Sequence, residues 1–129
     1  MWMAVGVDAN RHVDLYDQDF PISYVFNLIG YVTSGVTFYT NAPDISPTAV
    51  GWTTRGLATY KENPIICFIE LVCPFSSETF GLRKNVRTGE IIGSVQNHNF
   101  ASVHPNTPDS QLDQYISHLE IDMFLMGIG

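Results

Sequence analysis

Charged side chains are scarce in this sequence. Asp, Glu, Lys and Arg together make up 15% of its 129 residues, whereas about a quarter is usual for a globular protein. Hydrophobic residues, in contrast, reach 45%, which is enough apolar surface to offset the chain entropy lost on folding and excludes a disordered chain. The length predicts a single domain spanning residues 1–129. The low charge also suggests that another molecule covers part of its surface.

Positive charge is especially scarce, with 6 basic against 13 acidic residues and a formal net charge of −7. Such a surface repels phosphate backbones, so we expect no nucleic-acid partner. Half of the basic residues fall within five positions, at Arg83, Lys84 and Arg87. They are followed by Thr88 and Gly89, which suggest a turn. This cluster is either the solvated tip of a hairpin or a contact for an acidic neighbouring protein.

The sequence lacks a hydrophobic run long enough to cross a bilayer. Its longest, residues 64–75, contains Glu70 and is shorter than the about 20 residues that a spanning helix needs, so we expect no membrane span. Residues 1–8 carry no basic residue before their apolar stretch, which predicts that no secretory signal is present and that the protein is made in the cytoplasm.

The sequence has two cysteines, Cys67 and Cys73, six positions apart. On a single strand they would be separated by roughly 20 Å, whereas a disulfide requires Cα atoms within about 7 Å. We therefore expect free thiols. The even spacing places both on one strand face with Ile69 and Leu71, which favours burial in the core over a reactive or metal-binding role.

Helical periodicity is rare in the sequence, whereas short runs of β-branched and aromatic residues recur between Gly, Pro, Asn and Asp. This pattern predicts an all-β domain, a single antiparallel β-sandwich of about nine strands. Residues 64–75, apolar on both faces, are expected to form a central, doubly buried strand. The segments expected to form the strands are residues 3–7, 12–16, 24–33, 35–39, 57–60, 64–75, 79–84, 90–96 and 117–125.

Residues 97–114 are rich in Asn, Asp, Ser, His and Pro. This composition predicts one long surface loop, and loops of this length are often functional. We expect a partner to fix its shape, because its few apolar residues are too sparse to anchor it to the domain.

The last strand alternates clearly. Its core face is expected to carry Leu119, Ile121, Met123 and Leu125. The opposite side changes from polar to apolar towards the chain end, which suits contact with another subunit. The predicted partner-contact residues are Trp2, Arg83, Lys84, Arg87, Phe124, Met126 and Ile128.

No catalytic, cofactor or metal motif is recognisable. The acidic alternation between Asp8 and Asp19 superficially resembles a calcium-binding EF-hand loop, but Val13 stands where that loop needs Gly and Asp19 replaces its bidentate Glu. The histidines lack zinc-site spacing, and the sequence contains no Gly-x-Ser-x-Gly elbow. We therefore expect no enzyme and no cofactor.

Glycan or receptor binding is an alternative function. Aromatic rings with a polar group can stack on sugars, and three of them, Trp52, Tyr39 and Tyr60, lie near expected strand ends. A β-sandwich with such rings on its surface would act as a binding module.

Two segments, residues 6–17 and 119–129, are similar to the opening hairpin and the closing strand of the small β-sandwich proteins in the tail tips of long-tailed bacteriophages. The resemblance implies a virion structural component that is built into a larger assembly, and it offers no catalytic residues. We therefore expect a non-enzymatic assembly subunit. Its partners would be further copies of the chain or other virion proteins.

Overall fold

A computed structural model describes residues 31–32, 34–85, 91–106 and 108–129, and the structural statements below concern these residues. The strands expected at 3–7 and 12–16, and most of the one at 24–33, lie outside them. The described residues contain no helix, and the prediction of an all-β sandwich is confirmed. The strands are β1 (Thr37–Phe38), β2 (Gly51–Gly56), β3 (Cys67–Lys84), β4 (Ile91–Val103), β5 (Gln111–Ile116) and β6 (Asp122–Ile128).

The long strand β3 lies at the centre of the fold. Its first part, residues 67–72, pairs with β6, and its last part, residues 80–84, pairs with β5. Strand β4 pairs antiparallel with both parts. Two sheets result that share the β3–β4 hairpin. The hydrogen-bonded order is β1, β6, β3, β5, β2, with β4 paired to β3. The first sheet therefore contains β1, β6 and the first part of β3, the second contains β2, β5 and the last part of β3, and β4 extends both.

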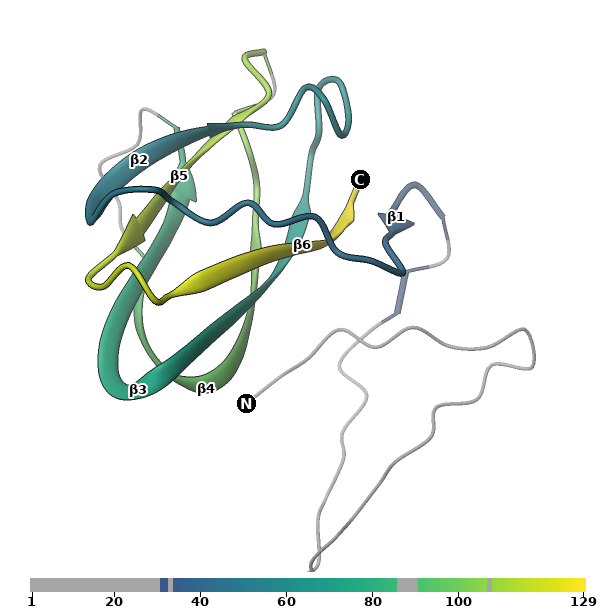
Figure 1. The fold of residues 1–129 in the computed structure, drawn as a ribbon. Coiled ribbons are helices and arrows are strands. Elements are labelled where there is room, and N and C mark those ends of the chain that lie inside the picture. Colours follow the sequence, from purple (N-terminus) through teal and green to yellow (C-terminus); the bar gives the residue numbers. More distant parts are fainter. Residues whose placement is uncertain (1–30, 33, 86–90, 107) are drawn as a thin grey trace, which may run out of the picture.

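The hairpin is bent where the two sheets meet. Pairing between β3 and β4 is interrupted between Cys73 and Glu78, and both strands curve there together (Figure 1). Pro74 lies at this irregularity, which is where a strand tolerates a residue that cannot donate a ladder hydrogen bond. The bulge also changes which positions face inwards, from the odd-numbered Cys67 to Cys73 before it to Phe80 and Leu82 after it.

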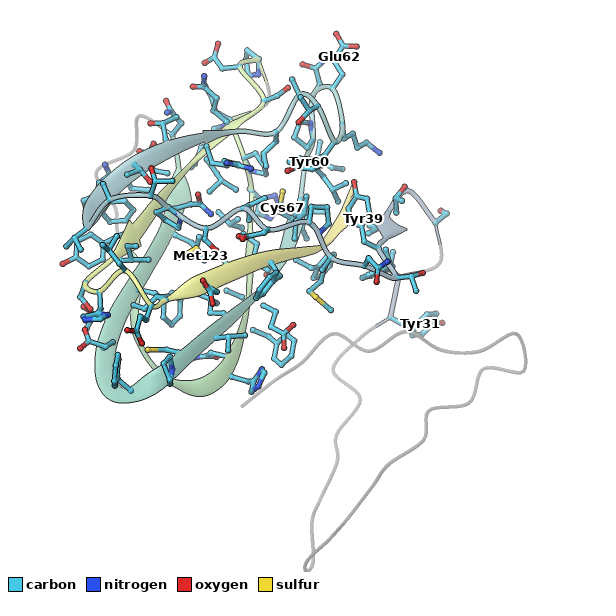
Figure 2. All side chains as sticks on the ribbon, in the orientation of Figure 1. Tyr31, Tyr39, Tyr60, Glu62, Cys67 and Met123 are labelled. Atoms are coloured by element: carbon cyan, nitrogen blue, oxygen red, sulfur yellow. The ribbon has the colours of Figure 1, made fainter. Side chains whose placement is uncertain are left out.

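The core lies between the two sheets. Alternate residues of each strand face it, as a half-buried antiparallel sheet requires. Tyr39 and Tyr60 pack against it, and Figure 2 shows both close to Cys67. The buried hydrophobic residues are Ile45, Leu57, Cys67, Ile69, Leu71, Cys73, Phe80, Leu82, Val103, Leu112, Ile116, Ile121, Met123, Leu125 and Ile128.

The expected central strand at 64–75 begins at Cys67 and does not end at residue 75, because it continues through the strand expected at 79–84 as the single strand β3. Its expected burial on both faces is wrong. The inward residues are buried, whereas Phe68 and Val72 on the other face are half-buried. The hairpin expected between residues 79–84 and 90–96 is confirmed, because Thr79 pairs with Ser94 and Leu82 with Ile91.

The expected long loop at 97–114 is wrong. Strand β4 continues to Val103 and strand β5 begins at Gln111, so the connection is short. The polar residues that suggested a loop are accommodated in the sheets. Asp113 and Gln114 are buried in β5 and hydrogen-bonded, which removes most of the cost of burying them. The strand expected at 57–60 is also wrong. Residues 58–60 form a turn, and the strand in this region is β2, which ends before them at Gly56.

The final strand begins later and ends later than expected. Residues 117–120 form a bend and turn, and Leu119 is 58% exposed instead of buried. The inward positions of Ile121, Met123 and Leu125 are confirmed, since all three are fully buried.

Ile128 was expected on the outer side and is instead buried. The pairing explains this correction. Ile69 pairs with Leu125 and the preceding Phe68 pairs with Gly127, so Met126 is one extra residue in β6. An extra residue reverses the alternation beyond it and turns Ile128 towards the core.

The prediction that both cysteines are free and buried is confirmed. Burial also raises the pKa of the Cys67 thiol to about 12, which keeps it protonated and unreactive. We expect slow labelling of both thiols by a maleimide in the native protein and rapid labelling in denaturant. Fast native labelling of Cys67, at the rate of a small free thiol, would show that the core around it is open.

Candidate functional site

Four phenylalanines lie on the outer face of the first sheet, opposite the core. We call Phe38, Phe68, Phe100 and Phe124 the phenylalanine face. They occupy the positions that alternate with buried residues, such as Ile69 in β3 and Leu125 in β6. In an antiparallel sheet with one solvated face these outer positions are normally polar.

The phenylalanines are neighbours through strand pairing. Phe38 in β1 and Phe68 in β3 both pair with Gly127 of β6, and their ring centroids are 5.6 Å apart. Gly127 leaves room for this contact, because a Cβ there would lie 2.8 Å from a ring carbon of Phe38. Phe38 remains 45% exposed.

In the next row of the sheet, Glu70 of β3 lies between two phenylalanines. It pairs with Phe124 of β6 on one side and with Phe100 of β4 on the other. The carboxylate of Glu70 lies 2.9 Å from Nδ1 of His98. The expected outward position of Phe124 is confirmed by this register. Met126, the extra residue of β6, is half-buried.

An open hollow adjoins this face at the bend of the hairpin. It is lined by Val72, Cys73, Pro74 and His98. His98 pairs with Val72, so both point outwards, whereas Cys73 points into the core. The thiol and the imidazole therefore lie on opposite faces of the sheet and do not form a nucleophile and base pair.

Acidic groups gather beside Phe124. The pKa of Asp122 is raised by partial burial and by the negative charges of Asp44 and Glu120. Asp44 forms an isolated bridge with Phe124, and hydrogen bonds from Ser46 lower its pKa. The strand segments of the first sheet, β1, β6 and residues 67–72 and 98–103, contain no Lys or Arg.

The basic cluster expected at 83–87 is only partly within the described residues, because Arg87 lies outside them, as does Trp2. Arg83 is held within the domain. Its guanidinium carbon lies 3.9 Å from the ring centroid of Trp52, and its Nε donates to Asp113 at 3.0 Å. Lys84 is half-buried. Most of the charge of Arg83 is therefore compensated inside the second sheet.

Asp113 is the centre of a polar network on the outer face of the second sheet. Besides Arg83, it accepts hydrogen bonds from Thr54 at 2.8 Å and from Asn85 at 3.1 Å. Asp113 is 6% exposed, and three donors offset the loss of its hydration.

The three aromatics of the glycan-binding alternative fall into two groups. Tyr39 and Tyr60 pack edge to face, with ring centroids 6.5 Å apart. Trp52 instead packs on Tyr115, with ring centroids 5.5 Å apart, and beneath Arg83. Sequence reasoning missed Tyr115 because it directly follows the segment assigned to a loop; an alternating pattern at Leu112, Gln114 and Ile116 was the available signal.

Within the described residues, no group of three or more His, Cys, Asp or Glu side chains is placed to hold a metal ion. The Asp8 to Asp19 segment lies outside them. Nor does the described part of the chain contain a helix that could span a membrane. Comparisons with protein families, curated proteins and solved structures found no match.

Replacing Asp113 with alanine should lower the free energy of unfolding by about 2–3 kcal/mol, because Arg83, Thr54 and Asn85 lose a buried charged acceptor. Urea denaturation measures this change. The control is Glu62→Ala at an exposed position (Figure 2), which should change stability by less than about 0.5 kcal/mol. Equal effects of the two variants would show that the network does not stabilise the second sheet.

Proposed function

We propose that this protein is a non-enzymatic assembly subunit whose phenylalanine face contacts a neighbouring chain. One observation carries the proposal: the first sheet places apolar aromatic side chains on its outer face, in addition to the buried apolar side chains of its core face. Several large apolar side chains gathered on one outer face are typical of a protein–protein interface, whereas apolar residues scattered singly are normal on any surface.

The proposed assembly is a bacteriophage tail. The resemblance to tail-tip β-sandwich proteins includes residues 119–129, and this segment supplies Phe124 to the outer side of β6 and, close to it, the half-buried Met126. The segment that carries the resemblance therefore coincides with part of the proposed contact. The neighbours would be other virion proteins or further copies of the chain.

Glycan or receptor binding is the second candidate, and it is less well supported. It was based on Trp52, Tyr39 and Tyr60 acting together. Trp52 contacts Tyr115 and Arg83, whereas the two tyrosines contact each other and the core. A glycan stacking on Trp52 would have to compete with the guanidinium of Arg83 for the indole ring.

The double variant Phe124→Ser and Met126→Ser should leave the isolated domain folded but prevent its incorporation into the native particle. Both side chains are half-buried and neither belongs to the buried core, so little core packing is lost. Ile121→Ser, at a fully buried position, should unfold the domain. Circular dichroism reports folding, and sedimentation of particles from cells that produce the tagged variants reports incorporation.

The matched control is Phe75→Ser with Leu119→Ser, two residues that are 43% and 58% exposed and belong to neither the core nor the phenylalanine face. This variant should be folded and incorporated. The proposal is overturned if the native chain does not sediment with any larger particle. It is also overturned if the wild-type protein binds to a glycan array and Trp52→Ala abolishes that binding while incorporation is absent.

A further inference from the structure

The charge around the phenylalanine face indicates what kind of partner it binds, an inference that rests on the proposed function. We propose that the partner is a different polypeptide whose contact surface combines apolar side chains with lysine or arginine. The apolar side chains would pack on the phenylalanine face, and the cations would lie beside the acidic rim, which we define as Asp44, Glu120 and Asp122.

Arg55 of β2 reaches the acidic rim from the second sheet: it donates a hydrogen bond to the backbone carbonyl oxygen of Asp44 at 3.4 Å, and its charge helps to lower the pKa of that carboxyl. The strand segments of the first sheet carry no Lys or Arg. Asp122 is close enough to Asp44 and Glu120 for their charges to disfavour its ionisation. A cation from a partner would relieve this repulsion when the interface is desolvated, and a buried interface discriminates strongly against unpaired like charges.

The rim and the apolar surface belong to one contact area. Asp122 and Phe124 are alternate residues of β6 and point to the same outer side, and Asp44 bridges to Phe124. Asp122 also pairs with Val72 of β3, and Val72 lines the open hollow at the bend. An apolar side chain of the partner could enter this hollow while a neighbouring cation reaches Asp122.

A second copy of the chain is a poorer occupant. Two copies meeting through this same face would bring two acidic rims together, and the chain has a net charge of −7. A head-to-tail arrangement would need a free basic surface elsewhere. Arg83 already interacts with Asp113 and Trp52, which reduces the positive potential that it offers to another copy. Charge complementarity therefore favours a basic partner.

Two synthetic strand peptides serve as probes. Both have alternating leucines, and the intervening positions are lysine in one and glutamate in the other. Titration into the full chain, followed by NMR, gives the affinity and the residues affected. We expect the lysine peptide to bind and to perturb Phe38, Phe68, Phe124 and Val72, and the glutamate peptide not to bind. Phe38→Ser should weaken binding of the lysine peptide about tenfold or more.

A charge-matched pair of variants separates the acidic rim from net charge. Asp122→Asn and Glu62→Gln each remove one negative charge from an exposed position. Asp122→Asn should weaken binding of the lysine peptide about twofold to fivefold, whereas Glu62→Gln should leave it unchanged. Equal weakening by both variants, or perturbations away from the phenylalanine face, would show general attraction to an acidic protein and overturn the inference.

Three further outcomes would also overturn it. Equal binding of the glutamate peptide would mean that the face selects apolar groups without regard to charge. Concentration-dependent self-association that Phe38→Ser abolishes would make a second copy the occupant. If the peptides fail while Phe124→Ser with Met126→Ser still blocks incorporation, the proposed function stands and the basic partner is wrong. If the lysine peptide binds as expected and the chain enters no particle, the proposed function fails.

Discussion

The bend in the β3–β4 hairpin is the constraint on which the rest of the structure depends. One continuous strand, β3, supplies the central strand of both sheets, so the two sheets are joined through its backbone and through that of its partner β4. The bulge between Cys73 and Glu78 also exchanges inward and outward positions. Because of it, Glu70 and Phe68 face outwards in the first sheet, and Gly81 and Arg83 face outwards in the second.

The two outer faces differ because the residues at these positions differ. Gly81 lets the indole of Trp52 lie across β3, since a Cβ there would be 2.9 Å from the ring, and Arg83 and Asp113 complete a self-contained network. Within the described residues, the outer face of the first sheet carries no comparable self-contained network. An additional chain would bury the exposed Phe38 and would place cations beside the carboxylates that repel one another.

The fold class could be predicted from the sequence because strand periodicity and turn residues are local signals. The even spacing of Cys67, Ile69, Leu71 and Cys73 likewise gave a buried face correctly. Strand β5 was missed because its polar residues Asp113 and Gln114 made the segment resemble a loop. Both are buried with hydrogen-bond partners on other strands, and composition does not show hydrogen bonds. The burial of Ile128 depends on one extra residue in β6 relative to β3, which is a property of pairing rather than of either strand alone. For the candidate site, alternation in β6 identified Phe124, whereas Phe38, Phe68 and Phe100 come together only through strand order.

Native-state hydrogen exchange of the β3 amides tests most directly whether the shared hairpin unites the two sheets. If it does, residues 67–72 and 80–84 should open with the same free energy, equal to that of global unfolding, because neither sheet can lose β3 alone. Opening of one of these segments at a free energy several kcal/mol below that of the other would contradict this account, since the two sheets would then unfold independently.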